Sequence, residues 1–407
     1  MGVSNDTMNY ITSGIKFACT NFKRRSPGSI AEAECQKYFK KELNNYADQV
    51  EEETFSLHPK AFMGVKLVVG ILNIFSVLMF WLSLIADSVV FSFISVVLIV
   101  FSVLSDTMET FLYRRFIDFF FPKAVSTNII ARRSPKGEVK RRIVFGGHAD
   151  AAYEMTYVLH GQNKTLIPVS LGSTLGMMFV LVFNLLLLIN SFRTRIIDIE
   201  FWKLIGIIEI AFVPFFIALL FFTNWKQVVD GANDNLSGCF VGIGLLKDMA
   251  EKNYRFEHTE VCCLITGGEE AGIRGSLAYT RRHKEELLKV DTVFIILDTM
   301  REIEHLEIFT RGQNSIQRNS KAVGDLLLEA GKNCGIPLPE LTLFVGATDA
   351  EAFSRYGIKA CAFCGVNRNP RLYYHTRFDT WDNISEECIK LSLDVCMEVS
   401  RLYDEKK

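Results

Sequence analysis

The stretch WKQVVDGANDNLSG occupies residues 225–238 and joins two very different kinds of sequence. Before it, residues 204–224 read LIGIIEIAFVPFFIALLFFTN, an apolar run long enough to cross a lipid bilayer. After it, the sequence has the character of a water-soluble α/β domain. The cluster around Asp234 looks by itself like an ordinary polar turn, so its meaning depends on what the rest of the chain builds around it.

Four long stretches without Lys or Arg predict transmembrane helices. They span residues 67–86, 88–105, 166–192 and 204–224, and each approaches or exceeds the roughly 18–20 residues that a bilayer requires. The last one carries an acid, Glu209, and a proline, Pro214. A single run of this kind is compatible with a buried helix of a soluble protein, but four runs in two pairs favour two membrane hairpins.

The remaining sequence predicts an α/β fold. Residues 260–266 and 292–297 are continuous apolar runs, which are typical of central strands covered on both faces. Helical periodicity alternates with such runs and covers residues 28–46, 320–334 and 385–403. This alternation predicts a mixed sheet with helices on both of its faces.

Shorter segments predict further strands in the first part of the chain. A short strand is expected at residues 53–57. Residues 127–132 and 142–147 are two apolar runs separated by the turn sequence SPKG (134–137), which predicts a β-hairpin.

The membrane runs interrupt the soluble fold instead of preceding or following it. We expect one soluble domain built from residues 1–62, 122–163 and 226–407. The first membrane hairpin then occupies residues 63–121, whose end, FLYRRFIDFFF, predicts an amphipathic helix at the membrane surface. The second hairpin occupies residues 164–225.

Acidic and histidine side chains follow the predicted strands and the glycine-rich turns. They are His148, Asp150, Asp234, Glu269, Glu270, Asp298 and His375. Open α/β folds build their sites at the carboxyl ends of their strands. Each signal is weak alone, because an HxD pair, adjacent glutamates or a strand-end aspartate commonly have structural roles. Together, two histidines and several carboxylates supply the ligands and the proton carrier that a two-metal hydrolytic centre needs.

Six short motifs make this interpretation specific. They are GGHAD (146–150), DGANDNLSG (230–238), ITGGEEAGIRGS (265–276), ILD (296–298), GATDAEAF (346–353) and YYHTRFDTWDNI (373–384). In order, spacing and flanking residues the set resembles the di-zinc exopeptidase family, which includes bacterial leucyl aminopeptidases, glutamate carboxypeptidase and the glutaminyl cyclases. The resemblance extends over residues 28–60, 125–152 and 230–400. It implies an α/β fold with a mixed, mostly parallel sheet sandwiched by helices, here with four transmembrane helices inserted as two hairpins.

The resemblance also assigns roles to individual residues. Five residues match the metal ligands of that family, namely His148, Asp234, Glu270, Asp298 and His375. Asp234 corresponds to the carboxylate that bridges both metals. His148 and Asp298 complete one metal site, and the remaining two ligands complete the other. Glu269 corresponds to the general base, and Asp150 to the acid that orients His148. The implied cofactors are two Zn²⁺ ions, although these ligand types also accept Co²⁺ or Mn²⁺.

The reaction implied most simply is that of an aminopeptidase, in which an activated water attacks an amide carbonyl and Glu269 carries the proton to the leaving amine. The alternatives are an N-acyl amidohydrolase, a glutaminyl cyclase-like enzyme, or a non-catalytic peptidase-like scaffold. The complete ligand set argues against the scaffold. Three residues close to His375 are candidates for substrate binding, with a solvated loop as the alternative: Arg368, Arg371 and Tyr374.

The departure from soluble members of the family lies between His148 and Asp234. These residues are separated by 86 positions (234 minus 148), and the second membrane hairpin fills the interval. Because its two ends lead directly to predicted metal ligands, we expect the metal centre to lie close to the membrane surface. This arrangement favours amphipathic substrates, such as hydrophobic peptides or lipid-linked amides. The alternative is that the spans only tether a peptidase for soluble peptides.

Charge and cysteine content bear on partners and location. The net charge of −1 gives no indication of a nucleic-acid partner. Basic residues flank the span ends that face the soluble domain, namely Lys60, Lys66, Arg114, Arg115, Lys123, Lys164 and Lys226, whereas the opposite ends carry Arg193, Arg195 and Lys203. This excess predicts a multi-pass membrane protein whose catalytic domain faces the cytoplasm. The first 60 residues contain no signal-peptide pattern and the ten cysteines no pairing pattern, which agrees with that prediction.

Overall fold

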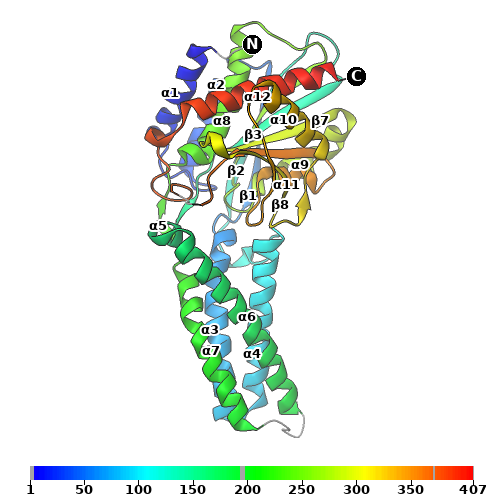
Figure 1. The fold of residues 1–407 in the computed structure, drawn as a ribbon. Helices are drawn as coiled ribbons and strands as arrows, with labels where there is room; N and C mark the ends of the chain where they lie inside the picture. The colour runs from blue at the N-terminus through cyan, green and yellow to red at the C-terminus, as the bar shows by residue number, and fades with distance from the viewer. Residues whose placement is uncertain (1–3, 193–197, 370–371, 407) are drawn as a thin grey trace. The chain divides into compact units, whose positions relative to one another are not determined.

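The computed structural model describes residues 4–192, 198–369 and 372–406, and its elements are labelled in Figure 1. The chain divides into two compact units. The first consists of Met1–Pro59, Pro122–Glu154 and Lys226–Lys407, and the second of Lys60–Phe121 and Met155–Trp225. Each unit is therefore built from segments that are far apart in the sequence.

The first unit contains a nine-stranded sheet. Its strands are β1 (Gln49–Leu57), β2 (Ala124–Arg133), β3 (Arg141–His148), β6 (Thr259–Thr266), β7 (Asp291–Met300), β8 (Leu306–Gly312), β9 (Gln317–Arg318), β10 (Glu340–Thr342) and β11 (Lys359–Gly365). They lie in the order β1-β2-β6-β3-β7-β11-β8-β10, with β9 paired to β8. The central strands β6, β3, β7 and β11 run parallel to one another. The predicted mixed α/β sheet is thereby confirmed.

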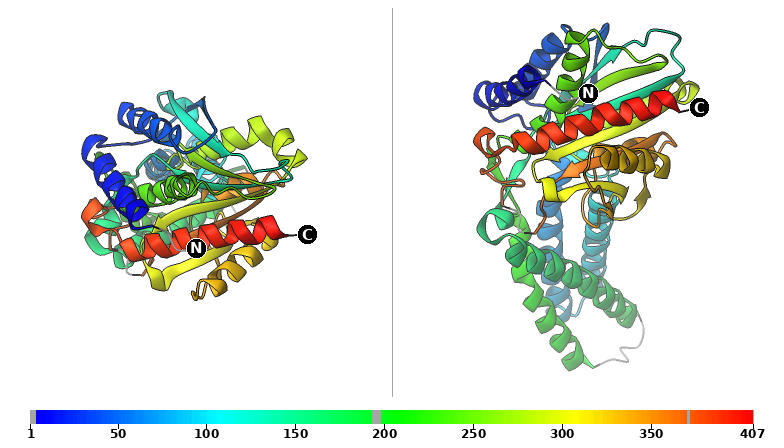
Figure 2. Two further views of the ribbon diagram at one scale, coloured as in Figure 1. Left: turned by 90° about the horizontal axis from the view of Figure 1, so that it is seen from above. Right: turned by 45° about the horizontal axis from the view of Figure 1, so that its top comes forward.

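Helices cover both faces of this sheet (Figure 2). One face carries α2 (Ile30–Leu43), α8 (Gly238–Glu251), α10 (Lys321–Asn333) and α12 (Glu386–Glu405), with α1 (Asn5–Asn21) packed on α8. The other face carries α9 (Arg274–Lys289) and α11 (Asp349–Ser354). Because successive strand residues point to opposite faces, Cys263 of β6 belongs to the core on the first face and Cys262 to the core on the second.

The predicted hairpin between β2 and β3 is wrong, because β6 lies between these two strands. In the sheet, Cys263 of β6 is opposite Ala131 of β2 on one side and Phe145 of β3 on the other. The predicted turn SPKG is hydrogen-bonded to the segment that precedes β6, because the Lys136 amide donates to the Phe256 carbonyl at 2.9 Å. All three strands are largely buried, so neighbouring positions in the sequence did not indicate which strands pair.

Both interruptions of the first unit begin and end at paired backbone positions. The residues Leu57 and Ala124, which close the antiparallel pair of β1 and β2, are directly opposite each other. Where the chain is interrupted a second time, the Val229 amide donates to the Ala152 carbonyl at 3.0 Å. Beyond this bond, β4 (Tyr153–Met155) pairs with β5 (Thr223–Val228) in a separate two-stranded sheet.

The second unit contains four helices that are long and apolar enough to cross a membrane, as predicted. They are α3 (Ala61–Ile85), α4 (Val89–Asp106), α6 (Asn163–Phe192) and α7 (Ile199–Leu220), and α5 (Thr156–Gly161) is a short additional helix. They run side by side (Figure 1). Apolar side chains such as Phe75, Phe93 and Ile207 are exposed on them, whereas their asparagines Asn73 and Asn184 are buried.

The predicted interfacial helix at the end of the first hairpin is not present. After the π-helical turn Thr107–Phe111, residues 112–121 contain only the short 3-10 helix Asp118–Phe120. The buried Glu109 carboxylate accepts hydrogen bonds from the amides of Phe116, at 2.6 Å, and Ile117, at 3.1 Å. These bonds fold the segment back on itself, and the apolar composition that suggested a helix gave no indication of this turn.

Candidate active site

The sheet brings most of the predicted site residues to one edge. His148 is the last residue of β3 and is paired with Thr266, the last residue of β6. Asp298 lies near the end of β7, the neighbour of β3 on its other side. Since these strands run parallel, the turn that follows β6 and carries Glu269 and Glu270 lies at the same edge.

Asp234 reaches this edge from the segment Ala232–Ser237, which precedes α8. Two glycines allow the close approach. Gly231 has the left-handed φ of 60°, and a Cβ there would lie 2.6 Å from the Asp234 carbonyl oxygen. A Cβ at Gly238 would clash with the carbonyl oxygen of Leu297 on β7. The small residues that resembled a polar turn are therefore required for packing the segment against the sheet.

The Asp234 carboxylate lies between the two predicted histidine ligands. Its Oδ1 is 3.1 Å from Nε2 of His148, and its Oδ2 is 3.0 Å from Nε2 of His375. Glu270 Oε1 lies 3.2 Å from the same nitrogen of His375. His148, Asp234 and Glu270 each offer a ligand atom, and these atoms all lie within 4.8 Å of one another, so this group can hold a metal ion.

The remaining predicted site carboxylates, Glu269 and Asp298, are half-buried beside this group, and their electrostatics are those of crowded acids. Burial, and then the charge of Asp234, raises the pKa of Asp298 to about 7. Burial also raises the pKa of Glu269 well above its ordinary value, with His148 opposing the shift and Glu270 adding to it. No Lys or Arg of the described residues forms an ion pair with Asp234, Glu269, Glu270 or Asp298. Oxygen and imidazole ligands with excess negative charge are a donor set that fits divalent zinc.

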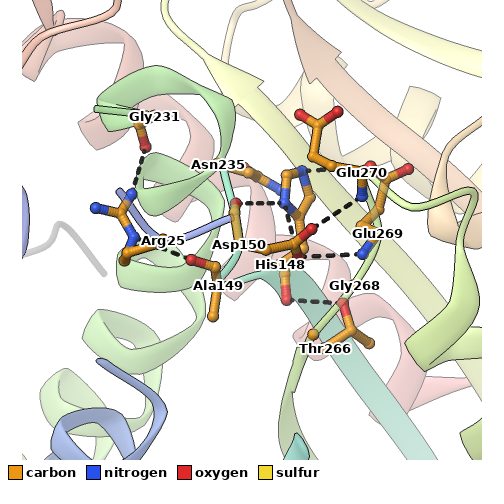
Figure 3. Close-up of polar contacts among 12 residues, drawn as sticks. Arg25, His148, Ala149, Asp150, Gly231, Asn235, Thr266, Gly268, Glu269 and Glu270 are labelled. Atoms are coloured by element: carbon orange, nitrogen blue, oxygen red, sulfur yellow. Dashed lines mark hydrogen bonds and ion pairs between the residues drawn. The ribbon is translucent and has the colours of Figure 1, made fainter. Parts of the chain in front are cut away.

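Asp150 positions the turn that carries the two glutamates (Figure 3). Its fully buried carboxylate accepts the backbone amide of Glu269 at 3.1 Å and that of Glu270 at 2.9 Å. Its carboxylate oxygen lies 3.6 Å from Nδ1 of His148, whereas its backbone carbonyl is closer to that nitrogen, at 3.1 Å. Asp150 therefore contacts His148 mainly through its backbone and fixes the glutamates through its side chain.

Two residues of this region received no role from the sequence. Asp379 is fully buried, and its carboxylate accepts the backbone amides of Asn233, at 2.8 Å, and Asp234, at 3.1 Å. Burial, and then the charge of Asp234, raises the pKa of Asp379 to about 7. The sequence feature that could have indicated a role for Asp379 is its position in the motif HTRFD, four residues after His375.

The second residue is Arg25, whose guanidinium is fully buried. Figure 3 shows it between Ala149 and Gly231. Its Nε donates to the Ala149 carbonyl at 3.0 Å, and its Nη2 donates to the Asp230 carbonyl at 2.6 Å. One side chain thus joins the segment that carries His148 to the segment that carries Asp234. Its position in the basic run KRR (23–25) gave no indication of a buried role.

The three candidates for substrate binding are placed differently. The Tyr374 ring stacks on the His375 ring with centroids 4.0 Å apart, so it lies at the site. The Arg368 guanidinium lies over the Phe309 ring, 4.5 Å from its centroid. Arg371 lies outside the described residues.

Comparison with known proteins agrees with this geometry. Residues 221–400 match the sequence profile of peptidase family M28. The resemblance to zinc exopeptidases and glutaminyl cyclases is thereby confirmed. The M28 match includes Asp234 and His375 but begins after His148 and Asp150, which precede the helices α6 and α7 in the sequence. None of the curated proteins matches the sequence significantly.

Several solved structures have a fold similar to that of this chain, and their classes agree with the M28 match. A glutaminyl cyclase from Fimbriiglobus ruber is 12% identical with a TM-score of 0.58, over 99% of this chain and 97% of that chain. An aminopeptidase from Aneurinibacillus sp. strain AM-1 is 16% identical with a TM-score of 0.58, over 97% and 93% of the two chains. A Zn-dependent exopeptidase from Parabacteroides distasonis is 13% identical with a TM-score of 0.55, over 98% of each chain.

Proposed function

We propose that the protein is a membrane-embedded exopeptidase with two zinc ions, most simply an aminopeptidase. The observation that carries the proposal is the position of the Asp234 carboxylate, whose two oxygens lie 3.1 and 3.0 Å from imidazole nitrogens of two different histidines. A carboxylate that presents one oxygen to each of two ligand sets is suited to bridging two metal ions. The zinc peptidase fold and the M28 match support the same class of enzyme.

The ligands divide into two sets around Asp234. We assign His148 and Asp298 to one ion and Glu270 and His375 to the other. Zinc, when bound, supplies Lewis-acid chemistry that polarises the scissile carbonyl and acidifies water. The side chains of the protein hold the ligand positions and move the proton.

Glu269 is the proposed proton carrier. Its carboxylate lies 3.9 Å from Nε2 of His148, and its backbone is fixed by the bond to Asp150. The neighbouring amide of Glu270 is held by the same carboxylate, so Asp150 fixes the backbone of both glutamates. Glu269 accepts a proton from the attacking water and delivers it to the leaving amine as the amide bond breaks.

A glutaminyl cyclase-like or N-acyl amidohydrolase reaction is the second candidate. The observation that favours it is that a glutaminyl cyclase and an aminopeptidase have equal TM-scores to this chain. The same base and ligands serve either reaction, so the choice depends on the substrate pocket. Tyr374, stacked on His375, is the proposed contact to substrate, and Arg368 is a further candidate.

We propose further that the four long helices span a lipid bilayer, with the catalytic unit in the cytoplasm. Apolar side chains such as Phe75, Phe93 and Ile207 are exposed on them, whereas the polar side chains of Asn73, Asn184 and Glu209 are buried, which is the arrangement expected in lipid. Amphipathic peptides or lipid-linked amides are the proposed substrates, because the second hairpin connects His148 and Asp150 to Asp234 along the chain.

One experiment tests the proposed reaction. The full-length protein, purified with zinc, is incubated with a library of peptides, N-terminal glutaminyl peptides and N-acyl amino acids, and the products are read by mass spectrometry. Loss of N-terminal residues supports an aminopeptidase, whereas a pyroglutamyl product or free acyl chains support one of the alternatives. A chain that binds zinc but leaves every substrate intact would favour the non-catalytic scaffold.

A further inference from the structure

The interior of the helical unit contains an acid that the peptidase mechanism does not use. Glu209 is the eleventh of the 22 residues of α7, so it lies about 15 Å from either end at 1.5 Å per residue. Its side chain is fully buried. Neither carboxylate oxygen has a hydrogen-bond partner among the described residues.

Packing between α7 and α3 defines the level of this carboxylate in the bundle. A Cβ on Gly206 of α7 would meet the Trp81 ring of α3 at 2.7 Å, and a Cβ on Gly70 of α3 would meet the Phe216 carbonyl of α7 at 2.7 Å. The two helices are therefore antiparallel. Glu209 is one turn from Gly206, so it lies about one turn from Trp81 along α3, beside the turn that carries Ser76.

Polar side chains gather at this level. Ser76 Oγ donates to the Ser95 carbonyl of α4 at 2.9 Å, and Asn184 Nδ2 of α6 donates to Ser76 Oγ at 3.1 Å. Asn184 is buried, and its amide oxygen also lacks a hydrogen-bond donor among the described residues. Buried oxygens on α7 and α6 thus have no hydrogen-bond donor among the described residues, an arrangement that a positive or hydrogen-bond-donating ligand would stabilise.

None of the described basic residues of the four helices forms an ion pair with Glu209. The Lys66 ammonium is 2.7 Å from the Asp106 carboxylate, towards the other end of α3. The Lys203 ammonium pairs with the exposed Glu200 at 2.6 Å. Lys164 is the second residue of α6, 20 positions before Asn184. An unpaired carboxylate in the centre of a membrane is costly, which is why such residues generally bind protons, ions or substrates.

We propose that Glu209 and Asn184 mark a site for a monovalent cation, either H⁺ or Na⁺, in the interior of the helix bundle. The proposal rests on the membrane insertion proposed above. Carboxylate, amide and hydroxyl oxygens are the ligands of hard cations, and a single carboxylate balances a single positive charge. In the proton case, the carboxyl group is neutral, which removes the cost of an uncompensated charge inside the bundle.

The test uses the full-length protein in liposomes and two matched variants. Glu209→Gln keeps the size of the side chain and removes its charge, and Glu200→Gln makes the same change at an exposed position of the same helix. Binding of radioactive sodium ions is measured at constant ionic strength with choline as the replacement cation. Infrared spectroscopy is used in parallel to detect a buried protonated carboxyl group.

We expect the wild type and Glu200→Gln to show either one bound sodium ion per chain or, in the difference spectrum against Glu209→Gln, one protonated carboxyl band, and Glu209→Gln to lack that signal. Sodium binding identifies Na⁺ as the ligand, and the infrared band identifies H⁺. Absence of both signals in the wild type, or persistence of the signal in Glu209→Gln, would overturn the site.

Flotation of the same samples tests membrane insertion separately, since a chain that does not float with liposomes has neither the insertion nor the site. Peptidase activity and zinc content, measured alongside, report on the proposed reaction independently.

Discussion

Arg25 donates a 3.0 Å hydrogen bond from Nε to the carbonyl oxygen of Ala149, the residue between His148 and Asp150. A second bond, from its Nη2 to the Asp230 carbonyl, holds the segment that leads to Asp234. A lysine in this position keeps the charge, but its single ammonium nitrogen cannot occupy both positions from which Nε and Nη2 of Arg25 donate. We therefore expect Arg25→Lys to weaken zinc binding by about 10–100-fold, as is usual when groups that orient metal ligands are lost.

The measurement is zinc affinity by competition with a chelator, together with activity as a function of added zinc. Recovery of kcat at high zinc concentration would show that Arg25 acts on the metal site, because a purely structural defect does not respond to zinc. Arg24→Lys, at the exposed neighbouring position, is the control and should behave as wild type. Unchanged zinc affinity in Arg25→Lys would contradict the positioning role.

The two adjacent glutamates should respond differently to the same change. Glu269→Gln removes the proton carrier and is expected to lower kcat by about 10²–10⁴-fold while two zinc ions remain bound. Glu270→Gln is expected to lose zinc as well, because its carboxylate faces His375 at 3.2 Å. Zinc content by atomic emission, measured on the same samples as activity, separates the two outcomes. Equal loss of zinc in both variants would remove the distinction between base and ligand.

Asp379→Asn tests the support beneath Asp234. An amide cannot accept hydrogen bonds at both of its positions, so at least one of the bonds to Asn233 and Asp234 is lost. We expect the free energy of unfolding to fall by about 1–3 kcal/mol and zinc affinity to fall with it. Asp382→Asn, at an exposed position nearby, is the control. Denaturant unfolding with and without zinc measures both effects, and a variant as stable as the control would show that Asp379 is dispensable.

Labelling of intact cells tests the orientation in the membrane. Nine of the ten cysteines are buried, and Cys334 is half-buried, so Lys406→Cys, at an exposed position, in a Cys334→Ser background presents one accessible thiol. With a cytoplasmic catalytic unit, an impermeant maleimide should label this thiol only after the cells are opened. Ready labelling of intact cells would place the unit on the outer side.

An acylated substrate tests the relation to lipid. One short peptide is compared with the same peptide carrying an acyl chain far from its N-terminus, both with enzyme in liposomes. If amphipathic substrates are preferred, kcat/KM should be higher for the acylated form by about tenfold or more, because the acyl chain partitions into the bilayer. Equal values for the two peptides would support the simpler view that the helices only tether the enzyme.

The sequence predicted what depends on local pattern and missed what depends on pairing over distance. Continuous apolar runs indicated β6 and β7, and charge-free length indicated the four long helices. The position of β6 between β2 and β3 was missed, because strand pairing is decided by the whole sheet and not by the intervening turn. Arg25 was missed for a similar reason. Its hydrogen-bond partners are backbone carbonyls, so no partner side chain in the sequence could indicate its role.

The paired ends of the two interruptions have a practical consequence. Leu57 faces Ala124 across one antiparallel pair, and Ala152 is bonded to Val229 across another, so each interruption is in effect a very long hairpin loop. Antiparallel strands can be closed by turns of only two residues. A chain in which two such turns replace residues 58–123 and 153–228 would retain every proposed zinc ligand and the base. Such a miniaturised enzyme should dissolve in water without detergent, which would make the chemistry accessible to crystallography apart from the bilayer.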